Sequence, residues 1–132
     1  MSNDKTKILL VCEDGRPALD ATAGTIQSAI NGSHEVKLRL ASEVSIQEIL
    51  AADCYLFGVG MAGSAAWKEL RRLFRGINLA GRQAAFFTGD IRESAKLREA
   101  FQDAGLSVSH QDLLVEECVD VPAWVRRALA RT

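Results

Sequence analysis

Hydrophobic residues along this chain fall into short apolar runs separated by amphipathic stretches. Three runs are nearly continuous in apolar residues, namely Lys7–Cys12, Cys54–Val59 and Gln83–Thr88. Such runs are typical of strands buried on both faces of a parallel sheet. In Glu35–Leu40, apolar and charged residues alternate, so we expect a strand with one face in water, at an edge of the sheet. Leu106–His110 is the fifth predicted strand.

The stretches between these runs carry apolar residues at helical spacing. A helix is expected from about Pro17 to the glycine at position 32, with an apolar face of Leu19, Ala23, Ile26, Ala29 and Ile30. Another is expected from about Ser64 to Phe74. Capping boxes at Ser45–Glu48 and Asp90–Glu93 predict two further helix starts. A last amphipathic helix is expected to begin at Asp120 and Pro122, with Trp124, Val125 and Leu129 on one side.

The regular alternation of strands and helices predicts an α/β fold, a doubly wound five-stranded parallel sheet with helices on both faces. A chain of 132 residues suits a single domain, 1–132. With the second strand at an edge, right-handed crossovers favour the strand order 2-1-3-4-5. Ligands of such sheets bind beyond the carboxyl ends of strands 1 and 3. The loops Glu13–Arg16, Gly58–Ser64 and Thr88–Ile91 are therefore the candidate site.

Composition narrows the classes of function. The formal net charge is -1, which gives no electrostatic footprint for nucleic acid or an anionic membrane. No apolar segment is long enough to cross a bilayer, and the first residues do not resemble a secretory signal. Three widely spaced cysteines suit reduced thiols, and we expect a cytoplasmic protein. We expect neither a metal site nor a catalytic constellation, because the histidines and cysteines lack the required spacing.

The segments "ADCYLFGVG", "INLAGRQAAFFTGD" and "AGLSVS", in this order, resemble the flavodoxin-like family over nearly the whole chain. The resemblance implies an FMN-binding electron carrier that serves redox or regulatory protein partners. It implies that the backbone of Gly15 and Arg16 meets the FMN phosphate. Around the flavin ring it implies the residues Gly60, Met61, Ala62, Thr88, Gly89 and Asp90.

The chain departs from the family pattern at both loops that would hold the cofactor. The family's phosphate loop has the form Thr/Ser-x-Thr-Gly-x-Thr, whereas this chain has "CEDGRP" at 12–17. Hydroxyl donors are missing, and carboxylates that repel a phosphate stand in their place. The aromatic residue that usually stacks on the ring would fall at Met61 or Ala62. The alternative is therefore a flavin-free flavodoxin-like or receiver-like domain that acts as a binding or regulatory module.

A phosphoreceiver domain shares this topology, and Glu13, Asp14 and Thr88 match three of its positions. However, its acceptor aspartate would fall at Gly58, so phosphoryl transfer to this chain is not expected.

Four features allow two interpretations each. Cys12 is either a reactive thiol at the site or a buried one. Trp67 either faces a ligand or belongs to the core. The segment 22–25, "TAGT", is either a displaced phosphate motif or part of a helix. The basic side chains of the third helix are either a docking surface or a solvated face; they are Lys68, Arg71, Arg72 and Arg75.

Overall fold

A computed structural model describes residues 7–30, 34–109, 112–115 and 120–129 of the chain. The strands are β1 (Lys7–Cys12), β2 (Glu35–Leu40), β3 (Cys54–Val59), β4 (Gln83–Thr88), β5 (Ser107–Val108) and β6 (Leu113–Leu114). The helices are α1 (Pro17–Ile30), α2 (Ile46–Ala51), α3 (Ala65–Phe74), α4 (Ile91–Asp103) and α5 (Val121–Leu129).

The strands form one parallel sheet in the order β2-β1-β3-β4-β5, with β6 also paired to β4. The α/β fold and the predicted strand order are confirmed, and β2 lies at the edge as expected. The strand order reverses between β1 and β3, so their carboxyl ends open at the switch point of the sheet. In the register, Cys12 lies opposite Gly58, and Val59 lies opposite Thr88.

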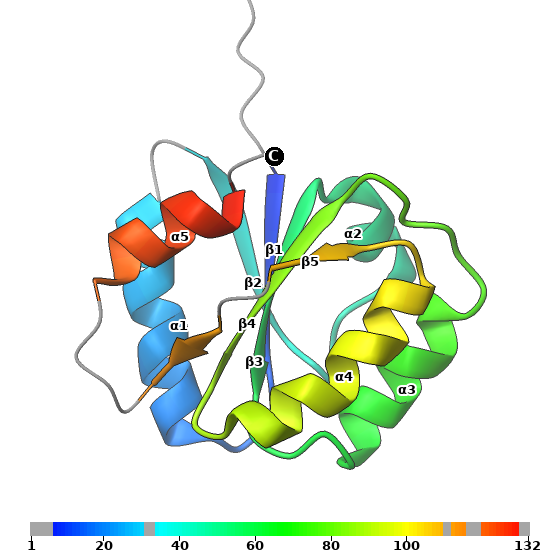
Figure 1. Cartoon of the computed structure of the whole chain (residues 1–132), viewed down its shortest axis with the longest axis horizontal. Coiled ribbons are helices and arrows are strands. Elements are labelled where there is room, and N and C mark those ends of the chain that lie inside the picture. The colour runs from blue at the N-terminus through cyan, green and yellow to red at the C-terminus, as the bar shows by residue number, and fades with distance from the viewer. Residues whose placement is uncertain (1–6, 31–33, 110–111, 116–119, 130–132) are drawn as a thin grey trace, which may run out of the picture.

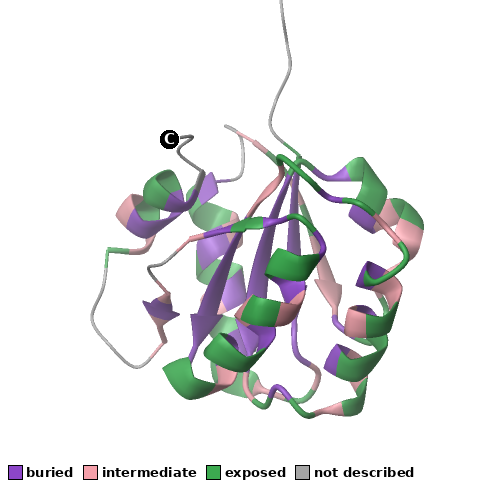
Figure 2. Cartoon of the chain, turned by 45° about the vertical axis from the view of Figure 1, so that its right-hand side comes forward, coloured by how far each residue is buried: buried purple, intermediate pink, exposed green. Residues whose placement is uncertain are grey.

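Helices cover both faces of the sheet, as Figure 1 shows, with α1 and α5 on one side and α2, α3 and α4 on the other. Each face has its own hydrophobic core. Trp67, Phe57 and Phe101 belong to the core beneath α2–α4, and Trp124 and Phe87 to the core beneath α1 and α5. The central strands are buried almost throughout, and the exposed residues lie mainly on the outer sides of the helices (Figure 2). None of the helices in the described ranges is long and apolar enough to cross a membrane.

The fifth strand is the main departure from the predicted elements. The sequence predicted one strand over Leu106–His110; the structure has β5 over two residues and a second piece, β6, further along β4. His110 lies outside the described residues. The guanidinium of Arg98 on α4 donates to the carbonyl of Ser109 and to Asp112, and the Ser94 hydroxyl donates to Asp112. These side-chain bonds connect Ser109 and Asp112 to α4.

The helix starts follow from local chemistry, with one correction. Ser45 and Glu48 form the predicted capping box of α2. Asp90 caps α4 by accepting from the Arg92 N–H, but the predicted box with Glu93 is wrong. Glu93 reaches the loop after β3 instead, and the Asp90 N–H donates to the Thr88 hydroxyl.

The first and last helices also agree largely with the sequence. The apolar face of α1 is buried as predicted except at Ala29, which is exposed. Ahead of α5, Asp120 accepts from the Ala123 N–H. Trp124 and Val125 are buried, while the Leu129 side chain lies outside the description.

Candidate functional site

The candidate site is formed by three loops at the carboxyl ends of β1, β3 and β4. All eight residues predicted to hold a cofactor lie on them: Gly15, Arg16, Gly60, Met61, Ala62, Thr88, Gly89 and Asp90. Side-chain bonds connect the first loop to the second, and the second to the third and to α4. The topology therefore brings these segments together, although they are far apart in the sequence.

A buried carboxylate, that of Glu13, lies at the centre of these loops. Its Oε1 accepts hydrogen bonds from the backbone N–H of Gly60 at 3.0 Å, the N–H of Met61 at 2.8 Å and the indole N–H of Trp67 at 2.6 Å. Its Oε2 accepts from Nε of Arg16 at 2.7 Å. Only 3% of Glu13 is exposed. The side chain that the sequence placed against a phosphate thus binds the protein itself.

The hydrogen bonds of Glu13 determine its charge state. Burial by itself raises the pKa of a carboxyl group, because it disfavours the anion. Here the donors Met61, Arg16, Trp67 and Gly60 outweigh burial, so the pKa of Glu13 lies below its ordinary value. The group is therefore an anion at neutral pH, and each of its donors is fully engaged.

The side chain of Arg16 lies across Gly60. A Cβ atom added to Gly60 would stand 2.7 Å from Nε of Arg16 and 3.0 Å from Oε2 of Glu13. A larger residue at position 60 would therefore displace the Arg16 side chain from its place beside Glu13. The Arg16 side chain is 41% exposed, whereas the carboxylate that it binds is buried.

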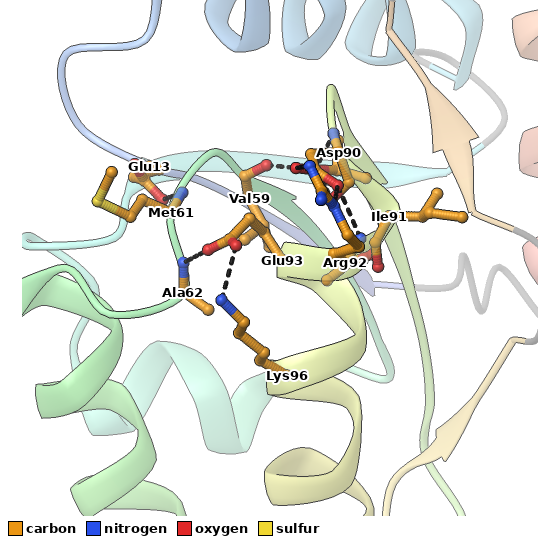
Figure 3. Close-up of polar contacts among 11 residues, drawn as sticks. Glu13, Val59, Met61, Ala62, Asp90, Ile91, Arg92, Glu93 and Lys96 are labelled. Atoms are coloured by element: carbon orange, nitrogen blue, oxygen red, sulfur yellow. Dashed lines mark hydrogen bonds and ion pairs between the residues drawn. The ribbon is translucent and has the colours of Figure 1, made fainter.

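The remaining loop donors are engaged as well. The N–H of Ala62 donates to Oε1 of Glu93 at 2.9 Å, and Oε2 of Glu93 pairs with Lys96 at 2.8 Å (Figure 3). Thr88 is fully buried, and its hydroxyl donates to the carbonyl of Val59 at 2.6 Å. Three consecutive N–H groups of the loop after β3, those of residues 60–62, are thus held by two carboxylates of the chain.

The loop after β1 contains a second carboxylate with a different partner. Asp14 accepts from the backbone N–H of Ser42 at 3.1 Å and from its hydroxyl at 2.5 Å. The carboxylate is therefore bound to the loop after β2, away from the loop after β3.

The backbone between β1 and α1 is shaped by Gly15 and Pro17. Gly15 adopts a φ of 70°, which favours glycine. Pro17 begins α1 and lacks an N–H, so the helix start offers one donor fewer to an anion.

Two exposed apolar side chains flank the loops. Met61, after β3, is 54% exposed, and Ile91, at the start of α4, is 55% exposed. Figure 3 shows Met61 in the loop after β3 and Ile91 at the start of α4, directly after the loop that follows β4. The resemblance places a flavin ring between these two loops. These side chains are aliphatic, so they offer an apolar contact to a flat ring without aromatic stacking.

The structure decides three of the features that the sequence left open. Trp67 belongs to the core, packed edge-on against Phe57, although its indole N–H reaches the site. Thr22 and Thr25 lie within α1, where their hydroxyls donate to carbonyls of the preceding turn. Cys12 is buried, and its thiol donates to Asp20 at 3.3 Å.

A cavity of about 590 Å³ lies beside Cys12, between α1 and β2. It is lined by Cys12, Asp20, Ala23, Leu38, Arg39, Leu40 and Glu43. Two of the four basic residues, Arg71 on α3 and Arg75 directly after it, line a different recess between α3 and α4, together with Lys96, Glu99 and Asp103. Arg72 pairs instead with Glu69. Because anionic side chains share that recess, the surface is of mixed charge.

The sequence did not predict the roles of two carboxylates that organise the site. Glu13 is buried and binds the N–H groups of Gly60 and Met61, and Glu93 binds the N–H group of Ala62. An acidic residue directly after a buried strand is the one local signal for Glu13. Three of its four donors lie 47, 48 and 54 residues away, and the fourth, Arg16, lies three residues away. Glu93 was interpreted as part of a helix cap, which its position three residues after Asp90 fits equally well.

The fold closely resembles those of solved flavodoxins. A flavodoxin from Streptococcus pneumoniae TIGR4 superposes with a TM-score of 0.77 at 12% identity, over 92% of this chain and 96% of that one. Flavodoxin 2 from Bacillus cereus, in its oxidised state, gives a TM-score of 0.75 at 22% identity, over 94% and 96%. A short-chain flavodoxin associated with a non-canonical PDU bacterial microcompartment gives 0.76 at 10%, over 94% and 97%.

The structural neighbours therefore define a flavodoxin-like fold. At this level of sequence identity the resemblance concerns the fold alone. No protein-family model matches the sequence, and no curated protein matches it either.

Proposed function

We propose that this chain is a flavodoxin-like domain that works without bound flavin, as a binding or regulatory module for another protein. The observation that carries the proposal is the occupation of the loop after β3. The chain's own carboxylates, Glu13 and Glu93, hold the N–H groups of residues 60–62. A cofactor at this position competes with ligands that are covalently part of the protein.

The fit of FMN to these residues is poor for electrostatic reasons. The phosphate is a dianion, and the loops present a buried anion at Glu13 beside the start of α1. One cation, Arg16, is already paired with that anion. Thr88, which the resemblance implies near the ring, donates its hydroxyl proton to Val59. FMN binding therefore requires existing hydrogen bonds to break before new ones form, and this lowers its affinity.

A titration with FMN tests the proposal directly. We expect purified protein to be colourless and to leave the fluorescence of added FMN unquenched up to high micromolar concentrations. Riboflavin serves as the control for binding through the ring alone. A flavin absorption spectrum in the purified protein, or saturable quenching at low micromolar FMN, contradicts the proposal.

An FMN-binding electron carrier is the second candidate. Two observations favour it: the structural neighbours are flavodoxins, and Met61 and Ile91 leave apolar surface exposed on the two loops. In that case the flavin supplies the redox chemistry, and the chain positions it through the backbone of its loops. The same titration separates the two candidates, because only the carrier binds FMN tightly.

A further inference from the structure

We propose that the donors around Glu13 form an anion site whose ligand is Glu13 itself, and that the site binds a small carboxylate or a phosphate monoester when this side chain is removed. The inference rests on the proposed function, because it gives a structural reason for a domain that works without bound flavin. It assigns to Glu13 the role of an internal ligand, meaning a side chain that occupies a binding site of its own protein.

The donor geometry supports this assignment. The N–H groups of Gly60 and Met61 and the indole N–H of Trp67 converge on one oxygen, between 2.6 and 3.0 Å. The second oxygen meets Nε of Arg16 at 2.7 Å. The three donors to Oε1 are fixed by the fold: two are backbone groups, and Trp67 is fully buried in the core. Convergent N–H groups with a guanidinium are the groups that recognise carboxylate and phosphate.

The tether explains why an external anion does not displace Glu13. Two methylene groups connect the carboxylate to the backbone directly after β1, where the Glu13 N–H is itself bonded to the Gly58 carbonyl at 3.0 Å. A ligand held in this way has an effective concentration on the order of millimolar or higher. A free anion must exceed that concentration or bind more strongly than the tethered group.

Removal of the tethered anion converts the donors into a site for an added one. The variant Glu13→Ala leaves a cavity of carboxylate size and four unpaired donors. We expect formate, the smallest carboxylate, to enter this cavity and restore the lost hydrogen bonds. Inorganic phosphate is the second probe, because it presents the group that FMN would place at these loops.

The experiment measures thermal unfolding of wild type, Glu13→Ala and Asp14→Ala in increasing formate or phosphate, against chloride at matched ionic strength. Asp14→Ala is the matched control, since it removes the adjacent charge, which binds Ser42 and not these donors. We expect a saturable rise in Tm for Glu13→Ala alone. An identical response of all three proteins overturns the proposal.

The test also works if Glu13→Ala does not fold in chloride. In that case formate is expected to restore the far-UV circular dichroism of the folded state, and failure to do so overturns the inference. Glu13→Gln keeps the side-chain volume and an acceptor oxygen, so it should fold and ignore formate.

A second arm separates this inference from the proposed function. We expect Glu13→Ala to bind FMN roughly tenfold more tightly than wild type does, and more tightly than it binds riboflavin, which lacks the phosphate. Tight binding of FMN by wild type contradicts the proposed function. Weak binding by wild type combined with no gain in Glu13→Ala contradicts the inference alone.

Discussion

The indole N–H of Trp67 donates a hydrogen bond of 2.6 Å to Oε1 of Glu13. The contact joins the loop after β1 to the first turns of α3, across the end of β3. Both residues are buried, Glu13 at 3% exposure and Trp67 at 0%. A core tryptophan thus positions the carboxylate that organises the candidate site, and this links the packing of α3 to the chemistry of the loops.

Replacing Trp67 by Phe removes this donor while keeping an aromatic ring against Phe57. We expect the free energy of unfolding to fall by about 1.5–3 kcal/mol, the value of a hydrogen bond to a charged group. Urea denaturation measures the change. In a Glu13→Gln background, Trp67→Phe should lower the free energy of unfolding by less, because the carboxylate that accepted the indole hydrogen bond is no longer charged. Equal costs in the two backgrounds contradict a direct coupling of the pair.

The lowered pKa of Glu13 predicts a pH dependence of stability. A carboxyl whose pKa is lower in the folded than in the unfolded state stabilises the fold above its unfolded pKa, and the effect is lost as the pH falls toward the folded value. Wild type should therefore exceed Glu13→Gln in unfolding free energy at neutral pH. The difference should shrink as the pH falls below the ordinary glutamate pKa.

Urea unfolding of both proteins across this pH range gives the measurement. Other acidic groups with lowered pKa values, such as Glu48, are present in both proteins and cancel in the difference. A gap between the two proteins that stays constant with pH shows that Glu13 does not titrate as described.

Gly58 is required by packing. A Cβ added there would stand 2.5 Å from Cε2 and 2.6 Å from Cζ of Phe87, a fully buried ring. We expect Gly58→Ala to lower the unfolding free energy by about 1–3 kcal/mol, as overpacked cores do. Gly63→Ala is the matched control, because a Cβ there meets nothing within 4 Å. Equal stability of the two variants argues against the described packing of β3 on β4.

The two described cysteines should be chemically inert in the folded protein. Burial, with the nearby Asp20 carboxylate, raises the pKa of Cys12 to about 12, and burial raises that of Cys54 to about 12. Since the thiolate is the nucleophile, iodoacetamide at about pH 8 should label neither residue until denaturant is added. Peptide mass spectrometry locates the label, also for Cys118, which lies outside the described residues. Rapid labelling of Cys12 in the folded protein contradicts this prediction and supports its interpretation as a reactive thiol.

Much of the fold could be predicted from local patterns. The bounds of β1, β2, β3 and β4 agree with the sequence prediction. The buried strands β1, β3 and β4 appear as continuous apolar runs, and the edge strand β2 appears as an alternation of apolar and charged residues. The fifth strand was predicted in its place beside β4, but its shortness and the second piece, β6, were not. Near β6, Arg98 and Ser94 of α4 bind Asp112, and such side-chain contacts leave no periodic pattern in the sequence.

The candidate site, too, could be predicted only in part. Its location followed from the sequence, because the strand order fixes which loops meet at the switch point. The partners of the carboxylates did not follow: the sequence placed Glu13 and Asp14 together against a phosphate, whereas one binds the loop after β3 and the other binds Ser42.

The sequence by itself therefore determined most of the elements, the order of the strands and which loops lie together at the carboxyl ends of β1, β3 and β4. Hydrophobic periodicity and helix caps act over a few residues, and connection rules act on whole elements. Only the tertiary structure decided that Glu13 faces Gly60, Met61 and Trp67, because a side-chain hydrogen bond depends on distances of a few ångströms between groups about 50 residues apart.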